Sequence, residues 1–131
     1  MTFNKFLKRL YKAYPYLNDT RLEYANAWGI TQFSPQESSI VFYLEALRPL
    51  QNSSRFIKRF GKSKSFNDFL IKTILHEVCH VHQYLYDYKK FCVGSHEIDI
   101  TIEHDRHPLE IAADQFARKE FKRWHLTKLK F

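Results

Sequence analysis

A His-Glu-x-x-His pattern at His76-Glu77-Val78-Cys79-His80 could bind a metal ion and activate water. In an α-helix, residues four positions apart project from the same face, so the imidazoles of His76 and His80 can approach one Zn²⁺ at about 2.0–2.1 Å each. Glu77 lies about 100° around the helix from His76, beside the ion rather than bound to it. The pattern therefore predicts one zinc ion per chain and Glu77 as the general base that takes a proton from the attacking water.

A catalytic zinc ion usually has three protein ligands, so a third ligand must come from the downstream sequence. The candidates are Cys92, His96, Glu97, Glu103, His104, His107 and Glu110. We favour Glu110, because Asp114 follows four residues later on the same helical face and could accept a hydrogen bond from the outer nitrogen of a ligand histidine. His104 and His107 remain candidates for an alternative ligand or for a group that stabilises the transition state.

Other polar residues lie near the motif on the same expected helix. His82 lies about 240° around the helix from His76, so we expect it to point away from the metal. Gln83 and Asp87 follow the stripe of the two motif histidines, where they either line the cleft or contact solvent. Cys79 also falls near the ligand face, and we expect it to be a small packing residue rather than a ligand.

Two expected helices position these side chains. The first runs from Ser65 to about Tyr88: Ser65 is a plausible N-cap with Asp68 three residues later, and apolar residues recur at helical spacing. The second opens at Pro108, which favours the first position of a helix, and it carries Glu110.

The other segments are expected to form an amphipathic helix over residues 3–13, two antiparallel strands over 21–28 and 39–47, a loop or short helix over 51–64, and a short strand or extended loop over 98–102. Helical spacing of apolar residues predicts the first, and short apolar runs between turn signals predict the strands. With 131 residues the chain is expected to form a single α+β domain over residues 1–131.

Composition sets further bounds. The two cysteines form no disulfide framework, which favours an intracellular, cytoplasmic setting, and we expect neither secretion nor a membrane span. The net charge of +7 and the basic, aromatic stretch over residues 118–130 permit contact with nucleic acid. We do not favour that partner from the sequence, because such a stretch is more often an amphipathic helix with a solvated face.

The two motifs, His76 to His80 and Glu110 to Asp114, together resemble the gluzincin branch of zinc metallopeptidases. The surrounding sequence looks like the small metallopeptidase-like proteins of bacteria and phages, including the ImmA/IrrE type. The resemblance implies a minimal zincin-like domain, with a small antiparallel or mixed sheet, an active-site helix and a C-terminal helix that supplies the third ligand. It implies His76, His80 and Glu110 as zinc ligands, Glu77 as general base and Asp114 as the residue that orients a ligand.

The same resemblance implies zinc-dependent hydrolysis of peptide bonds in a peptide or protein substrate. An edge strand at residues 40–44, or its neighbour, would bind the extended substrate by β-addition. Two alternatives stay open. One is a three-histidine ligand set, similar to that of SprT-like proteins, in which His96, His104 or His107 replaces Glu110. The other is a catalytically silent binding or regulatory protein of the same fold, associated with nucleic acid.

Overall fold

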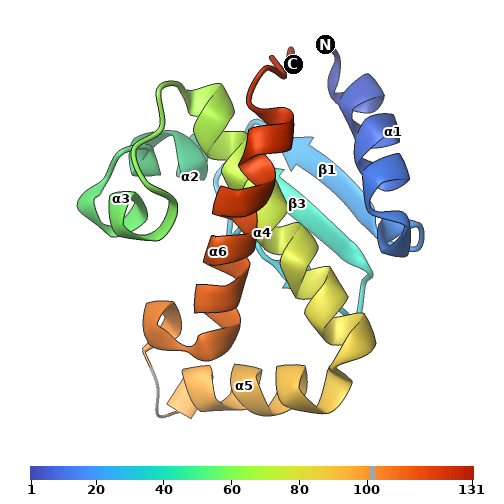
Figure 1. Cartoon of the computed structure of the whole chain (residues 1–131), viewed down its shortest axis with the longest axis vertical. Helices are drawn as coiled ribbons and strands as arrows, with labels where there is room; N and C mark the ends of the chain where they lie inside the picture. The colour runs from blue at the N-terminus through green and yellow to red at the C-terminus, as the bar shows by residue number, and fades with distance from the viewer. Residues whose placement is uncertain (101–102) are drawn as a thin grey trace.

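Six α-helices and a three-stranded sheet make up the described part of the chain, residues 1–100 and 103–131, in a computed structural model (Figure 1). In chain order the elements are α1 (Phe3–Ala13), η1 (Pro15–Leu17), β1 (Arg21–Ala25), β2 (Phe33–Ser34), β3 (Ser39–Tyr43), α2 (Leu44–Leu47), η2 (Arg48–Leu50), α3 (Ser54–Phe60), α4 (Phe66–Tyr86), α5 (Tyr88–Ile100), η3 (His104–Arg106) and α6 (Pro108–Trp124), where η marks a 3₁₀ helix. The fold is therefore α+β, as the sequence predicts.

The sheet is mixed, with strand order β1-β3-β2. β1 pairs with β3 in parallel, with Leu22 opposite Ile40, whereas β2 pairs with β3 antiparallel. The prediction that these two strands are antiparallel is thus wrong, because β1 runs parallel to β3. The tight turn before Ser39 places the short strand β2 against β3 as its hairpin partner, and β1 pairs along the other side.

β3 is the central strand, so of the two substrate edges expected from the sequence, the neighbouring strand is the one at the edge of the sheet. Ile40 and Phe42 are fully buried in the core, and Leu44 already begins α2. Ser39 and Ile40 pair with a strand on both sides, whereas residues 41–43 pair with β1 alone. The neighbouring strand β2 is an edge of the sheet, as is β1.

α4 is the central helix of the molecule, and its start follows the predicted capping pattern. Ser65 Oγ accepts a hydrogen bond from the Asp68 backbone N–H at 3.2 Å. The helix is buried along most of its length, with Ile71, Ile74 and Leu75 at 0% exposure. Figure 1 shows α4 running diagonally between the sheet behind it and α6 in front. None of the helices in the described part of the chain combines the length and apolar character that a bilayer crossing requires.

α6 begins at Pro108, as predicted, with His107 as its N-cap: His107 Nδ1 accepts from the Leu109 N–H at 3.1 Å. The small residues Ala113 and Ala117 of this helix are buried in the interior, both at 0% exposure. α6 therefore carries Glu110 toward the middle of α4 rather than away from it (Figure 1).

The expected strand or loop over 98–102 is not found in the described residues. Residues 98–100 end α5, and Thr101 and Ile102 lie outside the described residues. An alternation of five residues is too short to separate a strand from the end of a helix that begins ten residues earlier. The segment 51–64 contains the short helix α3, which ends at Gly61 with φ of 74°, a backbone conformation that favours glycine.

Candidate metal centre

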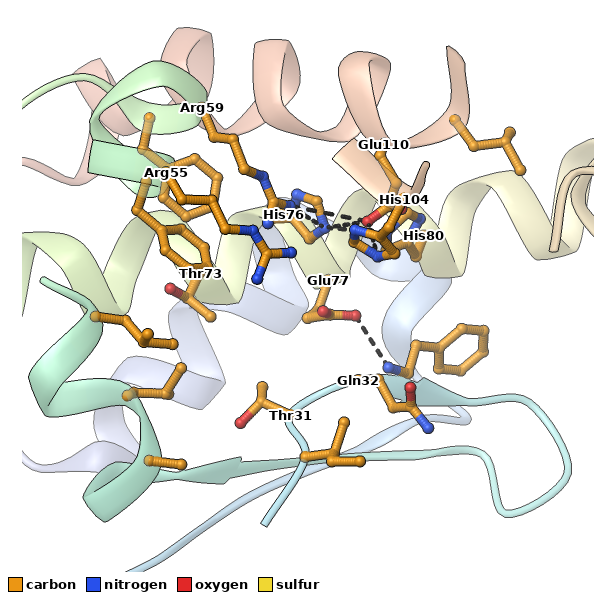
Figure 2. Close-up of a pocket in the computed structure, with 18 of the residues that line it drawn as sticks. Thr31, Gln32, Arg55, Arg59, Thr73, His76, Glu77, His80, His104 and Glu110 are labelled. Carbon is orange, nitrogen blue, oxygen red and sulfur yellow. Dashed lines mark hydrogen bonds and ion pairs between the residues drawn. The ribbon is translucent and has the colours of Figure 1, made fainter. Parts of the chain in front are cut away.

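Three donor side chains from α4 and α6 converge at one point in the interior (Figure 2). Suitable ligand atoms of His76, His80 and Glu110 all lie within 4.8 Å of one another. The two Nε2 atoms of the histidines are 3.0 Å apart, His76 Nε2 is 3.3 Å from Glu110 Oε1, and His80 Nε2 is 2.5 Å from Glu110 Oε2. The i, i+4 spacing on α4 stacks the rings, and the first turn of α6 supplies the carboxylate.

These separations fit a small tetrahedral ion. Two ligands bonded at 2.0–2.1 Å to such an ion stand about 3.4 Å apart. The separations found here, 2.5 to 3.3 Å, fall short of that value by less than about 1 Å. Side-chain adjustment alone would therefore admit the ion, and two imidazoles with one carboxylate form a donor set that suits zinc.

The charges of this cluster depend on one another. Burial lowers the pKa of His76, but the carboxylates of Asp114 and Glu110 outweigh burial and raise that pKa to about 9. Burial raises the pKa of Glu110, but its bonds to His104, His76 and His80 hold that pKa below its usual range. A proton on His76 thus compensates the carboxylates, and a metal ion at Nε2 has to displace it.

We therefore expect the chelator-treated protein to lose stability as the pH rises from about 6.5 to 9. The pKa of His76 is raised above its unfolded value of about 6.5, so its contribution is complete below pH 6.5 and is lost as the pH passes through about 9. The loss should reach at most about 3 kcal/mol in the free energy of unfolding. Urea titrations at both pH values measure it. In His76→Gln the free energy of unfolding should change little with pH, whereas the exposed-site variant His82→Gln should show the same pH dependence as the unaltered protein. An equal pH dependence in all three proteins would contradict the assignment of this effect to His76.

Asp114 and Arg59 lie behind His76. Asp114 Oδ1 is 2.8 Å from His76 Nδ1, the position expected for a residue that orients this ligand. Nδ1 is not aligned on it as a hydrogen bond, so the contact is an ion pair. The Arg59 guanidinium holds Asp114 with two bonds of 3.0 and 3.1 Å, and it lies 3.5 Å from His76 Nε2. Burial raises the pKa of Asp114, and His76 and Arg59 lower it by more.

Gln83 orients the second histidine. Its Nε2 donates to the Leu109 carbonyl at 3.0 Å, which leaves Oε1 facing His80 Nδ1 at 2.7 Å. Because Oε1 can only accept, Nδ1 of His80 carries a hydrogen, and Nε2 is the nitrogen that would bind the metal. The sequence left open whether Gln83 lines the cleft or contacts solvent. In the structure its amide instead bridges the His80 ring and the Leu109 carbonyl.

Gln83→Ala is expected to weaken zinc binding by about 10–100-fold, because the His80 ring loses the partner that fixes its tautomer and orientation. Competition with a chromophoric chelator measures the affinity. Gln36→Ala, at an exposed glutamine, is the matched control and should bind zinc as the unaltered protein does. An unchanged affinity in Gln83→Ala would contradict the orienting role.

Glu77 stands next to the cluster but is not part of it. Its Oε2 accepts a hydrogen bond of 2.9 Å from the Phe33 backbone N–H, which belongs to the edge strand β2 (Figure 2). The side chain is buried, with 6% of the residue exposed. This bond fixes the carboxylate between the donor cluster and the sheet, and it occupies only one of the two oxygens.

The structure separates the two histidines that the sequence left as alternatives. His104 Nε2 is 2.7 Å from Glu110 Oε1, its Nδ1 is 2.9 Å from Asp105 Oδ1, and about half of its side chain is exposed. Its hydrogen bond to Glu110 raises the pKa of His104. His107 instead caps α6 and is 5% exposed, so it does not reach the cluster. A role for His107 as a ligand or transition-state group stays a prediction, since the cap uses its Nδ1 and its Nε2 lies 3.7 Å from Glu97 Oε1.

The remaining candidates lie elsewhere. Cys92 and His96 are exposed on α5, Glu103 is exposed and pairs with Arg106 at 3.4 Å, and Glu97 is 3.7 Å from His107. Cys79 is half-buried, and burial raises the pKa of its thiol to about 12, so it is a neutral packing group. His82 packs against the rings of Tyr16 and Tyr86, away from the cluster as predicted, and Asp87 caps the end of α4.

The cluster opens into a cleft of about 510 Å³, lined by the loop before β2, α3, α4, α5 and the start of α6. In the loop before β2, Ile30 lines the cleft and is 78% exposed, and Trp28, two residues earlier, is 72% exposed. Gly29 makes this loop possible, because a Cβ there would stand 2.7 Å from the Tyr43 ring. Arg55 also lines the cleft (Figure 2). Its guanidinium holds Asp105 with two bonds of 2.6 and 2.8 Å.

Comparison of the chain with protein families, with curated proteins and with solved structures finds no match. The hypothesis of a metallopeptidase therefore depends on the residues themselves and on their geometry.

Arg59 is the residue of this centre that the sequence did not reveal. It lies in a basic segment, Arg55 to Lys64, that looks like an ordinary solvated stretch, and its partner Asp114 is 55 positions away. A signal does exist in the helical pattern, because Arg59 shares the apolar face of α3 with Phe56 and Phe60. An arginine on the buried face of a helix requires a buried acidic partner.

Proposed function

We propose that this protein is a zinc-dependent metallopeptidase with a minimal zincin-like domain. The observation that carries the proposal is the convergence of His76, His80 and Glu110 within 4.8 Å at the floor of an open cleft, with Glu77 fixed beside them. Metal ligands alone serve a structural site equally well, but a carboxylate held next to an open donor set supports hydrolysis.

The proposed chemistry is acyl transfer to water. Zinc held by the three ligands would lower the pKa of a water molecule and polarise the scissile carbonyl. Glu77 takes the proton from the attacking water through the carboxylate oxygen that Phe33 does not occupy, and it passes that proton to the leaving amine. The bond from Phe33 would hold the carboxylate in its place beside the cluster throughout.

His104 is the proposed donor to the oxyanion of the tetrahedral intermediate. It is the histidine of the cleft that is not among the three converging donors, and its Nε2 already points at Glu110. Glu110 and Asp105 raise the pKa of His104, so the ring in its protonated form can donate from Nε2 to a developing negative charge at the cluster while Nδ1 stays paired with Asp105. Arg55, bound to Asp105 on both sides of the carboxylate, in turn fixes that residue.

The proposed substrate is an extended peptide that lies along β2. This strand is an edge of the sheet and lines the cleft, and the Phe33 amide there already binds Glu77. Ile30, which lines the cleft and is exposed, favours an apolar side chain next to the scissile bond.

Metal removal tests the proposal. We expect purified protein to contain close to one zinc per chain by mass spectrometry and to cleave members of a quenched fluorescent peptide library. Treatment with a chelator should abolish cleavage, and added zinc should restore it. Protein that contains zinc but cleaves no peptide in the library would contradict the proposal and favour a silent binding protein, and protein that never binds zinc would remove its basis.

A further inference from the structure

The positive charge of the chain is concentrated in its two terminal segments. Residues 1–17 and 115–131 contain ten Lys and Arg and one acidic residue, Glu120, which gives a formal charge of +9. The whole chain has a charge of +7, so residues 18–114 carry −2. The net positive charge of the whole chain therefore comes from these two segments.

The fold brings the two segments together, although they are at opposite ends of the sequence. The Met1 amino group donates to the Lys128 carbonyl at 2.9 Å, and the Lys130 N–H donates to the Met1 carbonyl at 2.8 Å. Farther along, the ring of Phe6 in α1 packs on Trp124 in α6 with centroids 5.5 Å apart. Figure 1 shows the two ends of the chain side by side at one end of the molecule.

The basic side chains of both helices face solvent. The exposed residues of α1 are Asn4, Lys5, Lys8, Arg9 and Lys12. The exposed residues of α6 from position 118 to its end are Arg118, Lys119, Lys122 and Arg123. We define the basic surface as these eight cations together with Lys128 and Lys130. It thus covers two helices and the C-terminal tail.

The one acidic residue of these segments does not oppose this field. The Tyr14 hydroxyl donates to Glu120 Oε1 at 2.6 Å, and Arg123 contacts the same oxygen at 3.1 Å. Glu120 therefore turns inward against α1 and is already paired.

This arrangement has a cost for the fold itself. Lys5, Lys8, Arg9 and Lys12 place like charges three and four residues apart on α1, which destabilises a helix by a few tenths of a kcal/mol per pair. The first turn of α1 has no acidic residue to interact with the helix dipole. A surface that serves only solubility mixes both signs, so a surface of one sign indicates a polyanionic partner.

We propose that the basic surface binds the phosphate backbone of double-stranded nucleic acid. Lys5 and Lys12 are about 10 Å apart along the axis of α1, a length over which a duplex presents several phosphates. Of the large rings in these segments, Phe3, Phe6 and Trp124 are buried in the core, and Phe131, which is 50% exposed, packs against the rings of Phe3 and Tyr24. Phosphate contacts without base stacking are the pattern of sequence-independent duplex binding, whereas single strands need exposed rings.

The basic surface is separate from the metal cleft but shares α6 with it. Arg118 follows Glu110 by eight residues, about 12 Å along the helix axis. A bound duplex would therefore lie beside the cleft, and this inference does not rest on peptide hydrolysis.

Fluorescence anisotropy with a labelled 30-base-pair DNA duplex of mixed sequence tests the proposal. With about five phosphate contacts, affinity should fall roughly 500-fold between 50 and 200 mM salt. The triple variant Lys8→Glu/Lys12→Glu/Lys122→Glu should bind at least tenfold more weakly than the matched control Lys64→Glu/Lys89→Glu/Lys90→Glu, which has the same net charge. Circular dichroism checks that both variants are folded.

Three results would overturn the inference. The first is equal binding by the two triple variants, which would mean that net charge alone attracts DNA. The second is tighter binding to a single strand than to the duplex. The third is binding to phosphatidylserine vesicles without binding to the duplex, which would assign the basic surface to an anionic membrane.

Discussion

Glu77→Gln is expected to reduce peptide cleavage by about 10²–10⁴-fold while the protein keeps its zinc. The amide of glutamine has nearly the same shape as the carboxylate, and its carbonyl oxygen can still accept the hydrogen bond from Phe33. The substitution removes the basic oxygen and leaves the three proposed ligands in place. Rates with the best library peptide and zinc content from the same preparation give both readouts.

Glu103→Gln serves as the matched control, because Glu103 is an exposed glutamate outside the cluster. It should retain full activity and zinc. Cleavage by Glu77→Gln at the unaltered rate would exclude Glu77 as the general base. Loss of zinc in that variant would instead give the carboxylate a role in metal binding.

Glu110→Gln is expected to weaken zinc binding by about 10²–10³-fold. A site of four zinc ligands supplies about 10–16 kcal/mol, so one ligand contributes on the order of 3–4 kcal/mol. Glutamine is a weaker ligand, and its amide also removes the negative charge that faces His76 and His80. Chelator competition at pH 7.5 measures the loss.

Glu45→Gln, at an exposed position of α2, controls for the change of charge, and His104→Ala tests the other imidazole near Glu110. Under the proposed ligand set, His104→Ala keeps zinc bound and lowers the turnover number more than it changes KM. Unaltered affinity in Glu110→Gln together with loss of affinity in His104→Ala would transfer the third ligand position to His104.

The helices that carry the cluster could be predicted because their signals are local. Ser65 and Pro108 mark helix starts within a few residues, and the spacing from His76 to His80 fixes which side chains share a face. The pairing of Asp114 with His76 could also be anticipated from its position four residues after Glu110. Each of these features requires information from one helical turn only.

Contacts between segments that are distant in the sequence could not be predicted. The parallel pairing of Arg21–Ala25 with β3 depends on where β2 inserts, and no short pattern encodes that choice. Arg59 reaches Asp114 across 55 positions, so its role becomes visible only when α3 is placed against α6. The same holds for the basic surface, since α1 alone and the tail alone each look like an ordinary solvated helix.

The formal charges around the cluster indicate the kind of ion that it accepts. Four carboxylates, those of Glu77, Asp105, Glu110 and Asp114, surround the two imidazoles, whereas two guanidinium groups, those of Arg55 and Arg59, bind them. Two negative charges are left without a permanent counterion. One divalent cation would balance these two charges, as would protons on His76 and His104, whose pKa values are both raised by the neighbouring carboxylates. If the cluster holds a metal ion as proposed, that ion would replace these protons, so its binding should strengthen as the pH rises.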